Sequence, residues 1–273
     1  APGRSLIFMV KGAISPWGYC SRLYRSLRDA TRHRRLSVPK DGQRYPLPTE
    51  LTALETAAGQ RLLSHAVSDS KLVAALLTQE HPAFCAVASA MTIARSRGVG
   101  PLDQRSFMDV FREVDMKAPL MSAYGLDALD ELPSFLKYVL LRHLQYDGAP
   151  LALLAEWFRI LGFKVDLVSS ADIKEDTFRA DVAAVFSRSP SAAARQYLLV
   201  NYSRSVVGQR MFSGGHYAPI GGFNAEEDKV LLLEVNSWRY PSVWVDLPRL
   251  WLATHTQVAN GNWRGYLRIQ TPA

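Results

Sequence analysis

Cysteine is scarce in this sequence, and its scarcity limits the chemistry that the chain can perform. Only Cys20 and Cys85 occur among 273 residues, so neither a disulfide framework nor a cysteine-rich metal site can be built. No apolar run approaches the roughly 20 residues that span a bilayer, so we expect no transmembrane segment. Internal repeats and low-complexity tracts are also lacking. What remains is a globular protein of one large or two small domains, with no required metal.

The sequence begins with Ala1 rather than Met, so it leaves the compartment open. The protein is cytoplasmic or, if a leader was removed ahead of Ala1, periplasmic. The sequence is compatible with a homodimer but does not decide the oligomeric state.

Positive charge is concentrated in one segment. Residues 20–40 hold seven basic residues and one acidic residue, and so carry +6 of the formal net charge of +7. Such a segment could bind nucleic acid or an anionic surface, but no nucleic-acid motif or interleaved aromatic residues accompany it, so we favour a solvated helical face and expect no nucleic-acid partner. Prolines and a glycine follow at positions 39–48. We therefore expect a basic N-terminal arm over residues 1–50 and a catalytic domain over 51–273.

The hydrophobic period changes along the chain, which predicts an α+β fold. The first half favours helices, and the second half favours antiparallel strands. The helices are expected over 52–66, from a cap at Ser68 or Ser70, from Cys85, and over 104–114, 126–145, 150–161 and 173–186. The strands are expected over 162–168, 196–202, 215–223, 229–235 and 263–270, with a hairpin at 224–228.

Cys85 is the first candidate for chemistry. Small and apolar residues follow it without a breaker until Gly98, so Cys85 lies in the first turn of a buried helix. The unpaired N–H groups and the dipole at a helix start favour a thiolate, which is the nucleophilic form. Pro82 fixes the approach of the chain, and Gln79 is placed to donate an N–H to an oxyanion beside the sulfur. The alternative is a structural core cysteine, which is also our expectation for Cys20.

His216 is the candidate base. It begins a strand after Gly215, where a missing side chain allows a close approach to a ligand. Glu234 and Asn236 are two positions apart on the returning strand, so both face one way, and either could orient the Nδ1 side of the imidazole. A cysteine, a histidine and an orienting acid or amide suffice for thiol-dependent acyl transfer, and the order is that of papain-like enzymes.

Two longer motifs surround these candidates. One is Thr78-Gln79-x-x-Pro82-Ala83-Phe84-Cys85, and the other runs from Gly215-His216-Tyr217-x-Pro219 to Asp228. Both resemble the phytochelatin synthase family. With Leu231–Val235 and Arg264-Gly265-Tyr266, the resemblance covers about residues 55–269 and is to the short bacterial type of the family. It implies a papain-like cysteine peptidase fold, a transpeptidase or hydrolase acting on glutathione or a related thiol peptide, and a role in metal detoxification.

The resemblance also implies roles for single residues. Cys85 attacks the carbonyl of the Cys–Gly bond and releases glycine, His216 transfers the proton, and Gln79 supplies the oxyanion donor. Arg264 grips a glutathione carboxylate, and Gly215 lines the same site. Water or a second thiol peptide resolves the γ-glutamylcysteinyl thioester. The resemblance implies no required cofactor. Cadmium or zinc ions would act as activators bound to the thiolate of the substrate.

This chain departs from the family pattern in two places, at the triad acid and on the side of the second substrate. The family's triad aspartate falls at Glu234, while Asn236-Ser237-Trp238 is similar to papain itself, and we favour Glu234 by register. An acid expected ahead of Arg264 has no match among residues 255–258. We therefore expect hydrolysis to dominate over chain extension. The rival hypothesis is a non-catalytic binding or scaffold protein of the same fold that uses the basic arm.

Overall fold

The structure is a computed structural model and describes residues 44–81, 83–100, 103–104, 149–187, 195–211, 214–258 and 261–271. The helices predicted over 104–114 and 126–145, nearly all of the basic arm, and Cys20 and Pro82 lie outside the described residues. The candidate site residues lie within the described ranges: Gln79, Cys85, Gly215, His216, Glu234, Asn236 and Arg264.

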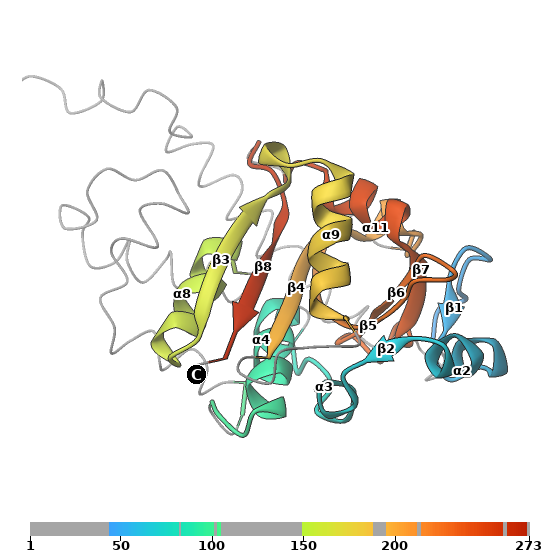
Figure 1. Cartoon of the computed structure of the whole chain (residues 1–273), viewed down its shortest axis with the longest axis horizontal. Coiled ribbons are helices and arrows are strands. Elements are labelled where there is room, and N and C mark those ends of the chain that lie inside the picture. The colour runs from blue at the N-terminus through green and yellow to red at the C-terminus, as the bar shows by residue number, and fades with distance from the viewer. Residues whose placement is uncertain are drawn as a thin grey trace, which may run out of the picture.

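An antiparallel sheet forms the middle of the molecule, with strand order β1-β7-β6-β5-β4-β8-β3 and with β2 paired to β5 (Figure 1). The sequence favours this arrangement because hydrophobic residues fill both faces of its central strands. The strands are β1 Thr52–Ala53, β2 Val67–Ser68, β3 Lys164–Ser169, β4 Gln196–Ser203, β5 Gly215–Asn224, β6 Lys229–Leu232, β7 Val243–Asp246 and β8 Gly265–Gln270.

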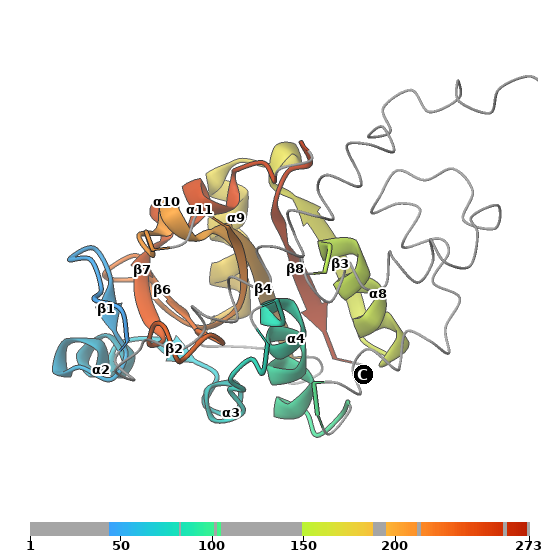
Figure 2. The ribbon, with the colours of Figure 1, turned by 180° about the vertical axis from the view of Figure 1, so that it is seen from behind.

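Helices cover both faces of the sheet. In Figure 1, α9 and α11 lie in front of the strands, and the reverse view in Figure 2 brings α4 and α8 to the front. The α-helices are α2 Ala57–Ser64, α3 Ser70–Ala74, α4 Cys85–Ser96, α8 Leu151–Ile160, α9 Glu175–Val185, α10 Arg204–Val207 and α11 Leu247–Thr254, and a 3-10 turn spans Ser170–Asp172. The layered mixture of helices and antiparallel strands is the predicted α+β class.

The sheet divides the interior into two cores. Successive residues of β4 alternate between them: Tyr197 and Leu199 pack on the side of α4 and α8, whereas Leu198 and Val200 pack on the side of α9 and α11. All four are at most 2% exposed. Because burying one such side chain contributes roughly 1.5–3 kcal/mol, this alternation fixes the register of the central strands.

Several predicted boundaries were wrong for local reasons. The helix expected over 52–66 begins only at Ala57, because Thr52 and Ala53 pair with β7 and Thr56 caps the helix through its hydroxyl. The cap of the next helix is Asp69, not Ser68 or Ser70. The strand expected over 229–235 ends at Leu232, so the later residues of that segment lie in a loop. The strand β7 and helix α11 were not predicted.

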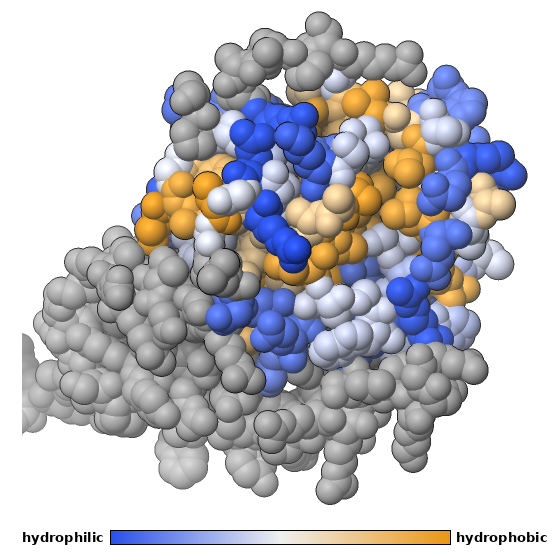
Figure 3. Space-filling model, turned by 90° about the horizontal axis from the view of Figure 1, so that it is seen from below, coloured by the Kyte–Doolittle hydropathy of each residue, from blue (hydrophilic) through white to orange (hydrophobic). Residues whose placement is uncertain are grey.

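Other elements agree with the sequence. The helix that begins at Cys85 and the helix ending before Gly162 are confirmed within one or two residues, as are strands β3, β4, β5 and β8 and the hairpin between β5 and β6. Hydrophobic side chains also gather in the middle of the described surface in Figure 3, bordered by hydrophilic ones. Within the described ranges, no helix has the length and apolar character needed to cross a bilayer.

Candidate active site

Cys85 is the first residue of α4, as predicted. Phe84 precedes it without capping the helix by a side chain, and the Phe84 N–H donates to His81 O at 2.9 Å. The ten residues from Cys85 to Ala94 are all buried, so packing on every side holds the helix. Cys85 itself is 9% exposed. The sulfur is therefore held at the positive end of a rigid helix, where a thiolate is favoured.

One hydrogen bond connects the nucleophile's helix to the strand that carries the base. Ser89 lies one turn after Cys85, and its hydroxyl donates to the backbone oxygen of Tyr217 at 3.0 Å. Tyr217 directly follows His216 on β5, and its own hydroxyl donates to Ala149 O at 2.9 Å. Residues far apart in the sequence are thus brought together by the packing of α4 on β5, which places Cys85 and His216 close enough for each to shift the pKa of the other.

Glu234, and not the side chain of Asn236, contacts the imidazole. His216 Nε2 lies 2.6 Å from Glu234 Oε1, and both side chains are at most 3% exposed. The nitrogen differs from our prediction, which placed the orienting residue at Nδ1. Asn236 takes part through its backbone, because its N–H donates to Glu234 Oε1 at 2.7 Å. Among the hydrogen bonds of the described residues, none joins the Asn236 side chain to His216.

The position of Glu234 follows from the way the chain leaves the sheet. Leu233 still donates its N–H to Pro219 O at 3.0 Å, and the Glu234 N–H then donates to the Ser242 hydroxyl at 3.1 Å. Beyond this point the backbone turns, with the Arg239 N–H bonded to Asn236 O at 2.9 Å. The shared strand face assumed for Glu234 and Asn236 was therefore wrong, and a loop presents them instead.

Two buried polar residues that sequence reasoning missed surround the His–Glu pair. Arg204 Nη2 lies 2.8 Å from each ring nitrogen of His216 and 3.4 Å from Glu234 Oε1. Gln209 Nε2 donates to Glu234 Oε2 at 2.8 Å. Both come from the segment between β4 and β5, whose composition has no recognised motif. The pairing of these two strands sets Tyr202 opposite His216. The segment between them therefore lies next to the His–Glu pair, which the sequence alone does not show.

The charges of this cluster favour an ion pair between thiolate and imidazolium. Burial alone would raise the pKa of the Cys85 thiol, but the hydrogen bond and charge of His216 and the charge of Arg204 outweigh it and lower the pKa. Burial and Arg204 disfavour the protonated form of His216, yet Glu234 and Cys85 prevail and raise its pKa. The pKa of Glu234 is lowered to about 2, because the effect of burial, which would raise it, is outweighed by the charges of His216 and Arg204. A charged cysteine, histidine and glutamate can thus coexist.

Gln79 lies beside this cluster. Its backbone N–H donates to Val235 O at 2.7 Å, which pins the residue next to the Glu234 loop, and its side chain is 1% exposed. One N–H of the amide donates to His81 O at 2.8 Å. The role of Gln79 as an oxyanion donor stays a prediction.

Arg264 is buried near the thiol and is held by neutral partners. Its Nη1 donates to Asn201 Oδ1 at 2.7 Å and its Nε to the Thr256 hydroxyl at 3.0 Å. Burial lowers the pKa of the guanidinium, while the nearby Tyr217 and Cys85 act in the opposite direction. A Cβ at Gly215 would collide with the guanidinium, so a larger residue there would push Arg264 out of this position. No carboxylate of the described residues pairs with Arg264, which suits it to an anionic ligand.

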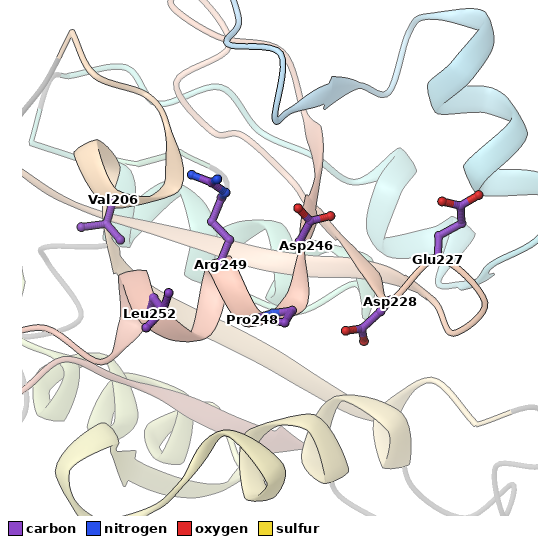
Figure 4. A pocket seen from close by; sticks show the side chains of 7 residues that line it. All are labelled: Val206, Glu227, Asp228, Asp246, Pro248, Arg249 and Leu252. Carbon is purple, nitrogen blue, oxygen red and sulfur yellow. The ribbon is translucent and has the colours of Figure 1, made fainter.

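A surface pocket of about 600 Å³ lies apart from this cluster, between the β5–β6 hairpin, α10 and α11 (Figure 4). Its lining contains none of the residues around Cys85. Two of its carboxylates are already paired, Asp228 with Arg179 and Asp246 with Lys229. Across the described ranges, no group of three or more histidine, cysteine, aspartate or glutamate residues is placed to hold a metal ion.

Comparison with known proteins gives one consistent result. Residues 42–266 match the family model described as phytochelatin synthase. The glutathione gamma-glutamylcysteinyltransferase of Schizosaccharomyces pombe is 26% identical over 240 residues, which cover 85% of this chain and 52% of that protein. Glutathione gamma-glutamylcysteinyltransferase 3 of Lotus japonicus is 30% identical, over 73% of this chain and 36% of its own length. Glutathione gamma-glutamylcysteinyltransferase 2 of Arabidopsis thaliana is 30% identical, over 74% of this chain and 39% of its own length. The chain thus spans about half or less of these relatives.

Proposed function

The chain belongs to the phytochelatin synthase family, and from this premise we propose that it is a cysteine-dependent enzyme that cleaves the Cys–Gly peptide bond of glutathione. Its layered α+β architecture is the papain-like cysteine protease fold of that family. The observation that carries the proposal is the buried contact of Cys85, His216 and Glu234 at the start of α4. The relatives supply the substrate, because they are named glutathione gamma-glutamylcysteinyltransferases.

The proposed reaction begins with the ion pair. The Cys85 thiolate attacks the carbonyl carbon of the Cys–Gly bond, and the oxygen becomes an oxyanion that the Cys85 backbone N–H and Gln79 stabilise. Collapse of this intermediate breaks the C–N bond, and the His216 imidazolium protonates the departing glycine amine. A γ-glutamylcysteinyl thioester remains on Cys85. His216, now neutral, takes a proton from the attacking water or amine in the second step, and Glu234 stabilises each imidazolium.

Arg264 is the proposed grip on the substrate. Its guanidinium lies close enough to the thiol for the Cys85 charge to affect its pKa, and Asn201 and Thr256 fix its orientation without neutralising it. A glutathione carboxylate can accept hydrogen bonds from the remaining N–H groups of the planar guanidinium. Gly215 leaves the room for this arrangement.

Hydrolysis is proposed to exceed transfer to a second peptide. Where the family pattern leads us to expect an acid ahead of Arg264, this chain places the Thr256 hydroxyl against Arg264 Nε. A hydroxyl offers no charge to hold an acceptor ammonium or amine near the thioester, and loss of such positioning costs several kcal/mol. Cadmium and zinc are proposed to act only as ions bound to the thiol of the substrate.

The test is the product of the reaction. Wild-type protein and the matched Cys85→Ala variant are incubated with millimolar glutathione, with and without cadmium or zinc, and products are measured by mass spectrometry. We expect glycine and γ-glutamylcysteine from the wild type, few longer chains, and neither product from the variant. Abundant chains with two or more γ-glutamylcysteine repeats would overturn the hydrolase proposal. No glycine under any condition would favour the non-catalytic binding protein.

A further inference from the structure

The two carboxylate oxygens of Glu234 have different partners. Oε1 faces the site, where it lies 2.6 Å from His216 Nε2 and accepts from the Asn236 N–H at 2.7 Å. Oε2 faces the other way and accepts from Gln209 Nε2 at 2.8 Å. Arg204 is farther from this carboxylate, at 3.4 Å from Oε1. Gln209 is therefore the side chain that the structure places on the outer oxygen.

We propose that Gln209 is a positioning residue that holds Glu234 Oε2, so that Oε1 stays directed at His216 Nε2. A glutamate has one more rotatable bond than an aspartate, and rotation about its last bond is broad. A carboxylate held only at Oε1 could turn and exchange its oxygens. The inference rests on the proposed function of Cys85, His216 and Glu234, and it adds a residue to the machinery that keeps their ion pair together.

Gln209 is itself fixed by the turn after α10. Its backbone N–H donates to Arg204 O at 2.8 Å, and the Gly208 N–H donates to the same oxygen at 3.1 Å. Gly208 has φ of 119°, a left-handed conformation that glycine adopts most readily. A Cβ at Gly208 would also lie 3.0 Å from Pro48 Cγ. The turn thus places the side-chain amide of Gln209, which is fully buried, against Glu234 Oε2.

A neutral amide suits this position better than a charged donor. The site already holds Arg204 and His216 beside the single carboxylate. A lysine or a further arginine at Oε2 would neutralise Glu234 and weaken its support of the imidazolium, whereas an amide donates without adding charge. An aliphatic side chain would leave Oε2 buried without this donor, which is costly for a charged group.

The experiment uses the whole 273-residue chain carrying Cys20→Ser, so that Cys85 is its one thiol. In this background Gln209→Met removes the donor at similar volume, and Gln209→Glu replaces it with a carboxyl that donates only when protonated. The first readout is the rate of Cys85 alkylation by iodoacetamide against pH, which needs no glutathione. The second is kcat for glycine release, measured also with Glu234→Gln and with the double variant, and melting temperatures are recorded for all.

We expect Gln209→Met to lower kcat and low-pH alkylation by about tenfold, because a hydrogen bond to a charged group is lost. In the Glu234→Gln background the same change should cost less than about twofold, because the carboxylate it supports is gone. The alkylation rate of Gln209→Glu relative to the parent should rise as pH falls and the new carboxyl regains its proton.

Three results would overturn the inference: an unchanged alkylation profile in Gln209→Met, equal losses in both backgrounds, or a pH-independent ratio for Gln209→Glu. If Gln209→Met does not fold, the ratio for Gln209→Glu decides alone. Absence of glycine release from the parent protein would refute the proposed function, while the alkylation profiles would still test Gln209.

Discussion

Replacing Glu234 by glutamine perturbs the site at one oxygen and leaves its shape nearly intact. The amide can keep the contacts with the Asn236 N–H and Arg204 Nη2 through its oxygen, but it carries no charge to stabilise the His216 imidazolium. The amide must also place either its oxygen or its NH₂ group toward Nε2, and the NH₂ group would select the wrong tautomer of the ring. We therefore expect Glu234→Gln to fold and to react slowly.

The size of the loss follows from the pKa of Glu234. It lies at about 2, compared with 4.5 for an ordinary glutamate. At about 1.4 kcal/mol per pKa unit, the site prefers the ionised carboxylate by about 3 to 4 kcal/mol, which is roughly a few hundredfold in an equilibrium constant. Misorientation of the imidazole adds to this, and removal of the charge from a comparable triad costs about 10⁴ in kcat. The expected loss in kcat for glycine release is between about 10² and 10⁴.

Asn236→Ala is the matched control. Because Asn236 reaches Glu234 through its backbone N–H, which alanine retains, we expect kcat to change by less than about tenfold. Both variants are assayed for glycine release, with melting temperatures recorded in parallel. A larger loss from Asn236→Ala than from Glu234→Gln, with both proteins fully folded, would refute the assignment of Glu234 as the orienting residue.

Three further predictions follow from the same contacts. Cys85→Ser should abolish glycine release without unfolding the protein, and Cys20→Ser should change turnover little; substantial release by the Cys85 variant would show that another group is the nucleophile. Arg264→Gln should raise KM for glutathione by about tenfold or more with a smaller effect on kcat, because it removes a charged hydrogen-bond donor; an unchanged KM would remove Arg264 from the substrate site. The stability contributed by the Glu234 carboxylate should be complete above pH 4.5 and disappear as pH falls through about 2, since its pKa is lowered on folding. Urea unfolding of wild type and Glu234→Gln should therefore converge toward low pH, and a constant difference would contradict the ion pair.

The sequence was most informative where local rules act alone. Cys85 at the start of a helix followed from the run of small and apolar residues after it, and the strand that contains His216 begins at the predicted glycine. The choice of Glu234 over Asn236 came from family register, and it is the Glu234 carboxylate that lies against His216 Nε2. These predictions needed no knowledge of tertiary contacts.

The features that sequence reasoning missed depend on contacts between distant segments. Arg204 and Gln209 belong to an unremarkable segment, and only the pairing of β4 with β5 turns it toward Glu234. The hydrogen bond from Ser89 to Tyr217 likewise requires α4 to lie on β5. The nitrogen that faces Glu234 was predicted incorrectly because it depends on how the loop after β6 leaves the sheet. Periodicity assigns residues to faces but does not place loops.

The central claim is that glutathione transfers its γ-glutamylcysteinyl group to Cys85. Intact-protein mass spectrometry of acid-quenched mixtures, followed by peptide mapping, measures this directly in protein mixed with excess glutathione for short times. We expect a transient mass increase equal to one γ-glutamylcysteinyl group, located on the peptide that contains Cys85, with glycine released in equal amount and no adduct in Cys85→Ala. Glycine release without any adduct on Cys85, or an adduct that retains the glycine, would contradict it.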